Sequence, residues 1–373
     1  AIQLADQNRH TQYAQEGEVG DAAPGCADDQ RRDARHQQPG RADGRQRDRT
    51  VQLGPEPNDG RESTSAGLEL ALLARENDMA LTVDAEEADR MLLSLDVFAG
   101  VLRDRRLDGW DGFGIAIQTY LKMAGGVIDF LTDLAQETGH RLPVRVVKGA
   151  YWDAEIKHAQ VEGFSGYPVF TRKANTDVSF IACARRVLRR RQAFYPQFAT
   201  HNAHTISIVR ELAGDRLDYE FQRLHGMGED LYGEVLNGNG PNRACRVYAP
   251  VGSHEDLLPY LVRRLLENGS NTSFVNRIVD EKLPVEKVAE DPVRKVRSRQ
   301  PVTHPSIPLP ADLYGSERRN SAGVNLASET ELAHLAERMQ AFADQQWTVG
   351  PLLASRLEPG AEGEWHPSTD PSE

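Results

Sequence analysis

Short apolar runs that alternate with longer amphipathic stretches place the strongest constraint on the fold of this chain. Residues 92–102 illustrate the amphipathic type, because their apolar residues recur at helical spacing and form one face: Leu92, Leu95, Phe98, Ala99 and Leu102. The apolar runs are short enough to be strands, and we identify six of them: Met79–Val83, Phe113–Ile117, Val144–Val147, Gln197–Thr200, Glu220–Leu224 and Arg246–Ala249. Strands separated by helices at spacings of about 25 to 50 residues predict parallel β/α units.

Six such units predict an α/β fold that is an incomplete (β/α)8, TIM-like barrel, because a closed barrel has eight parallel strands. The two further units would have to lie upstream, in residues 1–65. The first 64 residues hold only six large apolar side chains, nine Arg and no Lys. A segment of this composition cannot bury enough apolar surface to offset its chain entropy, so we expect disorder. The sharp change in composition near Gly67 favours translation from a wrong reading frame, and a natural disordered tail is the alternative.

Composition also excludes several classes of protein. The net charge of −12 argues against a nucleic-acid-binding surface, which needs clustered cations. The three cysteines lie far apart and indicate neither a disulfide framework nor a zinc site, which fits a reducing, cytoplasmic location. No apolar run approaches the 18 or so residues of a membrane span, and the N-terminus lacks the apolar core of a signal peptide. Any contact with a membrane is therefore expected to be peripheral.

Polar residues at the ends of the first two strands are candidates for a functional site. Asp84 follows the strand Met79–Val83, where a carboxylate can accept hydrogen bonds or act as a base. The alternative is a capping box, since Glu87 stands three residues on. Gln118 ends the next strand and can contact the polar edge of a bound ring, although a lone Gln at a strand end is also typical of an ordinary loop.

The stretch Arg145–Trp152 is more specific, because a β-branched run ends abruptly in a cation, a glycine and two aromatic residues. Arg145 and Lys148 are three positions apart, so they face opposite sides of a strand, and we expect one to point into the barrel mouth. The alternative for either is a salt-bridged surface cation. The directly following Gly149, Tyr151 and Trp152 favour a function, since barrel enzymes keep their chemistry at the carboxyl ends of strands.

The later strands end in further polar residues. Thr200 and His201 follow one strand, and although His204 stands nearby, a zinc site would need a third ligand that the pattern does not supply. The better interpretation is that these residues make polar contacts to the pyrophosphate or to the ring edge of a bound ligand. Leu224 precedes the turn His225–Glu229, whose isolated Gly-x-Gly is weak support for nucleotide binding.

The last strand and helix suggest a site for a small anion. Tyr248 ends the strand, and the expected helix Leu257–Asn268 carries two adjacent arginines and a glutamate: Arg263, Arg264 and Glu267. Adjacent helical residues diverge by about 100°, so the two guanidinium groups can approach one carboxylate from its two sides. An ordinary helix ion pair with Glu267 remains the alternative.

Together these motifs resemble the proline dehydrogenase domain of the bifunctional flavoenzyme family proline utilization A, over roughly residues 66–290. The resemblance implies a noncovalent FAD at the barrel mouth, lined by the following residues: Gln118, Arg145, Val147, Lys148, Gly149, Tyr151, Trp152, Thr200 and His201. It also implies a proline pocket made of Asp84, Tyr151, Leu224, Tyr248, Arg263, Arg264 and Glu267. Among these, the resemblance gives direct roles in the reaction to Asp84, Arg145 and Tyr151, and it implies no metal.

The implied reaction is the oxidation of L-proline to pyrroline-5-carboxylate, with electrons passing through FAD to a quinone at the inner face of a bacterial membrane. A pocket lysine of the family would lie in the upstream units, and no Lys occurs before Lys122. Two alternatives stay open. One is a catalytically inactive remnant, and the other is a different, metal-dependent (β/α)8 lyase.

Residues 291–373 resemble the start of the family's second domain, an NAD-dependent aldehyde dehydrogenase. Four prolines mark a linker: Pro301, Pro305, Pro308 and Pro310. One amphipathic helix is expected at about Glu329–Trp347, and residues 358–373 are expected to be disordered or out of frame. The NAD site itself is not expected within this chain.

Overall fold

The computed structural model describes residues 2–6, 61–237, 243–269, 284, 289–343 and 345. The chain divides into two compact units, Ala1–Gly323 and Val324–Glu373, which are considered separately. Most of the segment 1–65 and all of 358–373 lie outside the described residues, so the expectations for them stay predictions.

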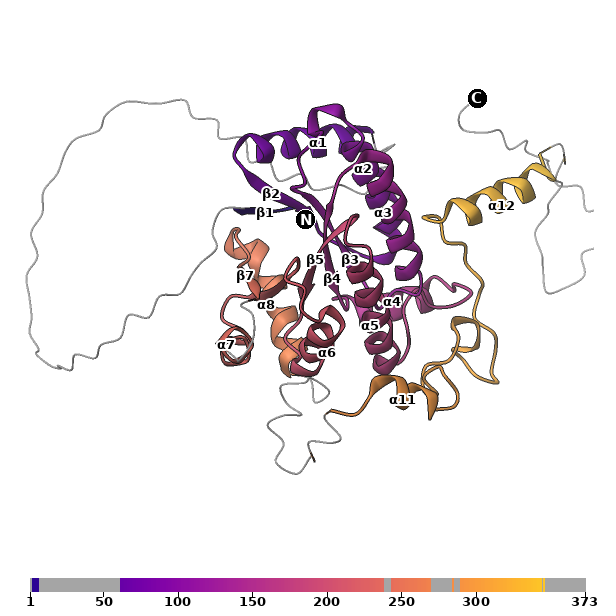
Figure 1. The fold of residues 1–373 in the computed structure, drawn as a ribbon. Helices are drawn as coiled ribbons and strands as arrows, with labels where there is room; N and C mark the ends of the chain where they lie inside the picture. The colour runs from indigo at the N-terminus through magenta and orange to yellow at the C-terminus, as the bar shows by residue number, and fades with distance from the viewer. Residues whose placement is uncertain are drawn as a thin grey trace, which may run out of the picture. The chain divides into compact units, whose positions relative to one another are not determined.

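The first unit is built on one curled sheet whose strands follow one another in chain order (Figure 1). All six predicted strands are present, which confirms the incomplete barrel. The strands are β1 (Ile2–Asp6), β2 (Met79–Val83), β3 (Phe113–Gln118), β4 (Leu142–Val147), β5 (Phe194–Ala199), β6 (Glu220–Leu224) and β7 (Ala244–Tyr248). From β2 to β7 every neighbouring pair is parallel.

Strand β1 departs from barrel topology, because it pairs antiparallel with β2, with Ile2 opposite Val83 and Asp6 opposite Met79. A (β/α)8 barrel has only parallel strands, so β1 does not replace a missing unit. The segment predicted to lack regular structure thus contains, among its described residues, this strand and the beginning of α1. Ile2 and Leu4 stand two residues apart with Gln3 between them, which is the period of a strand.

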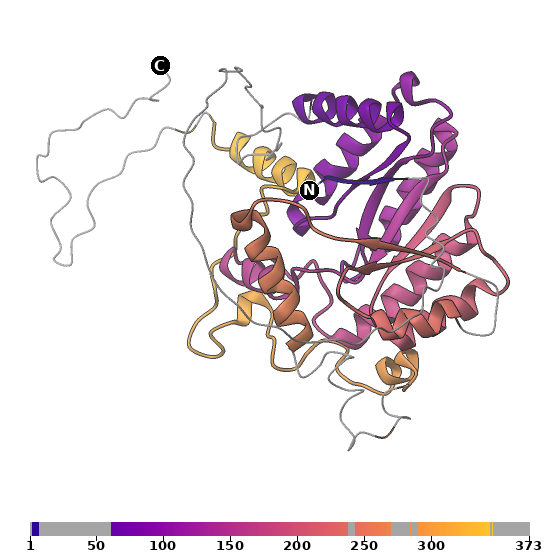
Figure 2. The ribbon, with the colours of Figure 1, turned by 90° about the vertical axis from the view of Figure 1, so that its left-hand side faces the viewer.

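Helices connect the strands and cover the outer side of the sheet (Figure 1 and Figure 2). They are α1 (Arg61–Glu76), α2 (Met91–Leu102), α3 (Ala124–Thr138), α4 (Trp152–Val161), α5 (Lys173–Arg189), α6 (Ala203–Ala213), α7 (Glu229–Asn237) and α8 (His254–Gly269). Helix α1 packs on α2 and β2, α3 on β3, and α5 on β4 and β5. The predicted helices at 92–102 and 257–268 are confirmed as α2 and part of α8. None of the described helices is both long and apolar enough to span a bilayer.

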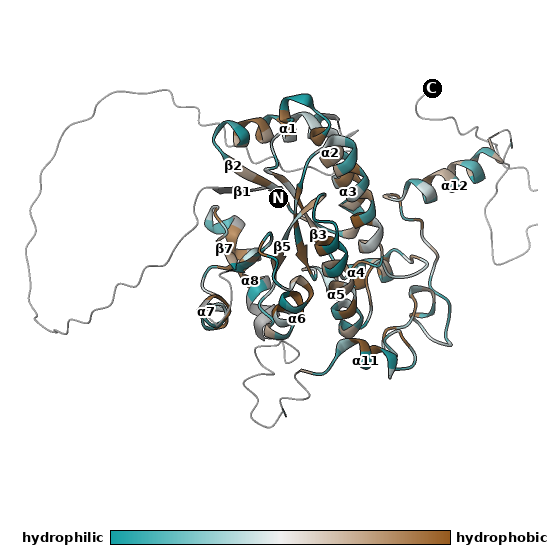
Figure 3. Ribbon diagram, in the orientation of Figure 1, coloured by the Kyte–Doolittle hydropathy of each residue, from teal (hydrophilic) through white to brown (hydrophobic). Residues whose placement is uncertain are grey.

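The two faces of the sheet differ in chemistry because side chains alternate along each strand. The outward face supplies apolar residues to the core beneath the helices, and Leu81, Ile115, Val144, Phe198 and Phe221 are among its buried members. Figure 3 shows apolar residues gathered in the strands and mixed polar and apolar residues on the helices. The inward face instead carries buried polar side chains, including Arg145, Gln197, Glu220 and Gln222.

The proline-rich stretch after α8 belongs to the first unit and is packed against the rest of it. It contains the short helix α11 (Pro292–Arg297) and a 3-10 helix (Pro310–Asp312). Arg172 donates to the carbonyls of Pro301 and Thr303, and Tyr167 donates to the carbonyl of Pro308 at 2.6 Å. In the second unit, α12 (Glu329–Gln340) begins where expected, with the Ser328 side chain as its cap, and it is shorter than the predicted 329–347.

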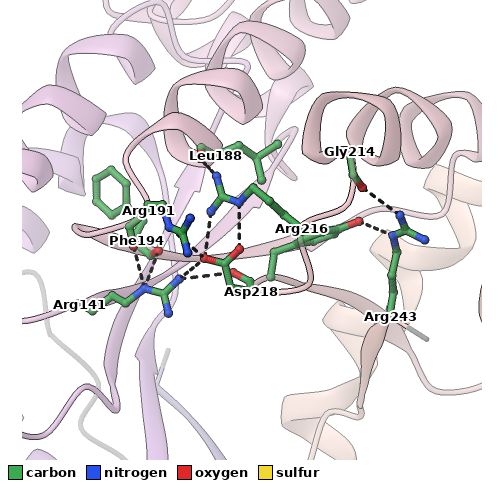
Figure 4. Close-up of polar contacts among 9 residues, drawn as sticks. Arg141, Leu188, Arg191, Phe194, Gly214, Arg216, Asp218 and Arg243 are labelled. Carbon is green, nitrogen blue, oxygen red and sulfur yellow. Dashed lines mark hydrogen bonds and ion pairs between the residues drawn. The ribbon is translucent and has the colours of Figure 1, made fainter. Parts of the chain in front are cut away.

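Arginines at the amino ends of the strands surround a single carboxylate (Figure 4). Asp218 accepts hydrogen bonds from Arg141 at 2.9 Å and from Arg216 at 2.9 and 3.0 Å, and Arg191 lies 4.0 Å away. Arg141 also donates to the carbonyls of Arg191 and Phe194. One acidic side chain thereby joins the segments that lead into β4, β5 and β6.

We predict that Asp218→Asn lowers the free energy of unfolding by about 1–3 kcal/mol, because it leaves partly buried guanidinium groups without their counter-charge. Hydrogen bonding from Arg216 holds the pKa of Asp218 below its usual value. The ionised carboxylate therefore stabilises the fold fully above the pKa of an unfolded Asp, and this contribution is lost as the pH falls through the folded-state pKa. Urea unfolding between pH 7 and pH 3 tests this, and the exposed Asp215→Asn is the matched control.

Candidate functional site

A buried arginine joins three strands at the carboxyl edge of the sheet. Arg145 on β4 is 9% exposed; its Nε donates to Oε1 of Gln222 on β6 at 2.8 Å, and its Nη1 lies 3.2 Å from Oδ1 of Asp84 after β2. Its guanidinium carbon also lies 5.9 Å from the ring centre of Tyr248 on β7. Two predicted residues, Asp84 and Tyr248, therefore meet Arg145 at the barrel mouth.

A buried carboxylate accepts hydrogen bonds from several polar side chains on the inward face of the sheet. Glu220, 2% exposed, pairs with Arg246 through two contacts of 2.9 and 3.0 Å. It also accepts hydrogen bonds from Gln197 at 2.9 Å and from Gln222 at 2.8 Å. Because the amide nitrogen of Gln222 donates to Glu220, its oxygen faces Arg145. A chain of contacts thus runs from Glu220 through Gln222 and Arg145 to Asp84.

Gln118 links two loops at the mouth. Its side-chain nitrogen donates to the carbonyl of Glu86 at 2.6 Å, and its oxygen accepts from the backbone of Ala150 at 3.3 Å. Tyr151 donates its hydroxyl to Glu86 at 3.0 Å. The loop after β2 and the loop after β4 are therefore fastened together at the residues that the sequence singled out.

The other residues of the Arg145–Trp152 stretch lie around this loop. Val147 is the last residue of β4, and Lys148 pairs with Asp177 on α5 at 2.5 Å. Gly149 has a φ of +131°, and a Cβ there would lie 2.5 Å from the Tyr120 ring, so only glycine fits without displacing that ring. Trp152 donates its indole N–H to the carbonyl of Phe170 at 2.7 Å.

His201 is held as a neutral ring. Its Nε2 accepts a hydrogen bond from the backbone of Leu224 at 3.1 Å, which places the proton on Nδ1. Burial, with Arg264 and Arg223 nearby, lowers the pKa of His201 to about 4. Thr200 is 7% exposed, and its carbonyl accepts from Tyr232 at 2.7 Å. Two hydrogen bonds therefore tie the residues that follow β5 to Leu224 on β6 and to Tyr232 on α7.

The last strand and helix contribute Tyr248 and Arg264. Burial raises the pKa of Tyr248 to about 12, and Arg264, Arg145 and Asp84 all lie close enough to influence it. Arg264 lies 5.4 Å from the ring centre of Tyr260 on the same helix. The side chains of Arg263 and Glu267 lie outside the described residues, so their part in the pocket stays a prediction.

Comparison with known proteins gives this arrangement a family. Residues 9–277 match the proline dehydrogenase family, which is more than half of the chain. The chain belongs to the proline dehydrogenase family. It is 52% identical to the bifunctional protein PutA of Klebsiella aerogenes and 50% identical to that of Rhizobium meliloti, over 82% and 77% of its own length. It spans 24% of the length of each of these relatives.

Solved proline dehydrogenase structures share the fold. A crystal structure of bifunctional proline utilization A (PutA) superposes with a TM-score of 0.75 at 50% identity, covering 79% of this chain and 30% of that one. The resemblance inferred from the motifs is confirmed. The match to residues 9–277 begins inside the segment 1–65, and the interpretation of that segment as disordered or out of frame remains a prediction.

The structure excludes one of the two interpretations of Asp84. A capping role is wrong, because Glu87 and not Asp84 precedes the 3-10 helix Ala88–Arg90, and Asp84 pairs with Arg145 instead. The described residues contain no group of three His, Cys, Asp or Glu that could hold a metal ion. His201 uses its Nε2 to accept from Leu224.

Sequence reasoning missed the buried polar side chains of the sheet interior. Glu220 and Gln222 are two residues apart, so they share one face of β6. Two polar side chains are unusual on one face of a buried strand, and this could have indicated a polar interior. Asp177 and Glu86 gave no such signal, because an acid in a helix or a loop is ordinarily solvated. Only the fold brings Asp177 to Lys148 and Glu86 to Tyr151.

We predict that His201→Gln flattens the pH dependence of stability between pH 6.5 and pH 4. An unfolded His binds its proton at about pH 6.5, whereas folded His201 stays neutral down to about pH 4. The wild-type chain therefore loses stability as the pH falls through this window, and the variant loses less. Urea unfolding at several pH values measures the difference, and parallel curves for the two proteins would contradict it.

Proposed function

We propose that this chain carries the residues of an FAD-dependent oxidation of L-proline to pyrroline-5-carboxylate, with a quinone as electron acceptor. One observation carries the proposal. In a member of the proline dehydrogenase family, a buried cation, Arg145, is fixed at the barrel mouth between Gln222 and Asp84, with Tyr248 beside it. A fixed cation at this place can stabilise negative charge that develops nearby.

The donor groups at the mouth fit a flavin nucleotide. Arg145 and Lys148 offer cations, Gln118 an amide, and Thr200 and His201 lie at the end of the next strand. Bound FAD would supply the hydride acceptor, which no protein side chain provides. Arg145 would hold the flavin ring, and Lys148, Gly149, Trp152, Thr200 and His201 would hold the remainder, as would Val147 through its backbone.

The proline pocket is proposed on the side of Asp84 and Tyr248. Arg264, together with Arg263, would bind the substrate carboxylate, since guanidinium groups match carboxylates with two parallel hydrogen bonds. Glu267 would lie beside the two arginines in the pocket. Tyr151, Leu224 and Tyr248 would wall the pyrrolidine ring. The Tyr248 hydroxyl is protonated at neutral pH, as that of any tyrosine with an ordinary pKa is, and can donate a hydrogen bond. Burial raises its pKa further and extends this state to higher pH.

The wider organisation is proposed from the same family membership. Residues 66–290 would form the proline dehydrogenase barrel fragment, and 291–373 would be a linker and the first helix of an aldehyde dehydrogenase domain that uses NAD. We propose a cytoplasmic location with peripheral contact to the inner face of the membrane, where quinone is available.

The antiparallel β1 favours a second candidate, a remnant that keeps these residues without catalysis.

The visible absorption spectrum of the purified chain after incubation with FAD tests the proposal. We expect a bound flavin band that bleaches when L-proline is added without oxygen. A chain that binds FAD and does not bleach would support the inactive remnant. A chain that folds and binds no flavin would refute the proposal.

We predict that Arg264→Ala lowers the apparent affinity for L-proline by roughly 10- to 100-fold, because a charge-assisted contact to a carboxylate contributes about 1.5–3 kcal/mol. FAD affinity should change little. Titration of flavin bleaching with L-proline measures the effect. Arg185→Ala, an exposed arginine on α5, is the control and should behave as the parent chain.

A further inference from the structure

One face of helix α4 holds the loop that carries Asp84. Tyr151, Glu155 and His158 recur at i, i+4 and i+7, the spacing of one helix face. Each contacts the loop between β2 and α2: Tyr151 donates to Glu86 at 3.0 Å, Glu155 accepts from the backbone of Ala88, and His158 lies 2.8 Å from Asp89. The helix therefore contacts the loop along its length.

Glu155 makes the central and most buried of these contacts. It is 3% exposed, and its Oε1 accepts the backbone N–H of Ala88 at 2.7 Å. Ala88 begins a 3-10 helix, and the residue before it, Glu87, makes no side-chain capping bond. The first N–H groups of a helix need acceptors from elsewhere, and a carboxylate at this end is also favoured by the helix dipole. Glu155 supplies that acceptor from a different element.

An ionised carboxylate at this buried position has an unfavourable desolvation free energy. Burial raises the pKa of Glu155, the Ala88 hydrogen bond opposes this effect, Asp89 and Glu87 add to it, and His158 opposes it. A small apolar residue would remove the desolvation cost, but it would leave the Ala88 N–H without this acceptor. The presence of Glu at a buried helix position is therefore explained by the loop that it holds and not by packing.

We propose that Glu155 is a positioning residue for Asp84, a role that rests on the proposed function of the site. Asp84 lies at the start of the loop and meets Arg145 at 3.2 Å. Arg145 has a second anchor in Gln222, whereas the loop residues 86–89 are held by α4 and Gln118. Release of the loop therefore displaces Asp84 relative to the substrate and leaves the cation beside the flavin in place.

The test compares Glu155→Ala with Glu155→Gln in the full chain loaded with FAD. Glu155→Ala should lower kcat/KM for L-proline roughly tenfold, while FAD affinity stays within about twofold, because one buried hydrogen bond to a charged group is removed. Glu155→Gln keeps an oxygen for the Ala88 N–H and should restore most of the loss. Glu211→Ala, an exposed glutamate on α6, is the matched control.

Hydrogen exchange of the loop, followed by mass spectrometry without flavin, gives a readout that does not depend on catalysis. Residues 84–90 should exchange faster in Glu155→Ala than in the parent chain or in Glu155→Gln, with the peptides of β4 and β6 unchanged. Unchanged exchange in the loop would overturn the inference. Equal loss of FAD affinity and of kcat/KM would also overturn it, since that pattern indicates general destabilisation. If the parent chain shows no proline-dependent bleaching, the proposed function fails, and the exchange result still decides whether Glu155 holds the loop.

Discussion

A buried guanidinium must be paired and hydrogen-bonded, and that requirement on Arg145 explains much of the sheet interior. Gln222 supplies one acceptor, and Asp84 supplies the counter-charge. Gln222 can present its oxygen only because Glu220 accepts from its nitrogen, and Glu220 in turn needs Arg246. Where ordinary barrels fill the interior with branched apolar residues, this one carries a polar chain of contacts that ends at the mouth.

The amino ends and the carboxyl ends of the strands have different roles. At the amino ends, Arg141, Arg191 and Arg216 gather around Asp218 and join three strand entries, which is a contribution to stability (Figure 4). At the carboxyl ends, short loops hold Asp84 and Tyr151 over the mouth. This division matches the behaviour of β/α barrels in general, where the amino face stabilises and the carboxyl face binds.

The sequence predicted the strands because their outward residues must be apolar to pack beneath helices, and Phe113, Val144 and Phe221 show this plainly. It also located the mouth, since the residue after a parallel strand faces the carboxyl edge. It did not predict the partner of any of these residues. The pairing of Lys148 with Asp177 or of Glu155 with Ala88 depends on how α4 and α5 pack, and no local pattern encodes it. The pairing of β1 with β2 was missed because the low apolar content of residues 1–64 predicted disorder there.

Among the described residues, β7 pairs only with β6, and β2 has only the antiparallel β1 on its other side, so the site lies in a sheet that is not closed. Several residues of the proposed proline pocket nevertheless lie close together. Asp84 and the Tyr248 ring both contact Arg145, and Arg264 lies close enough to Tyr248 to influence its pKa. Arg145 makes this possible, because it reaches from the middle of the sheet to Asp84 and to the Tyr248 ring at once. The geometry of the mouth is therefore set by the polar interior of β4 and β6, and closure of the barrel is a separate requirement that bears on stability.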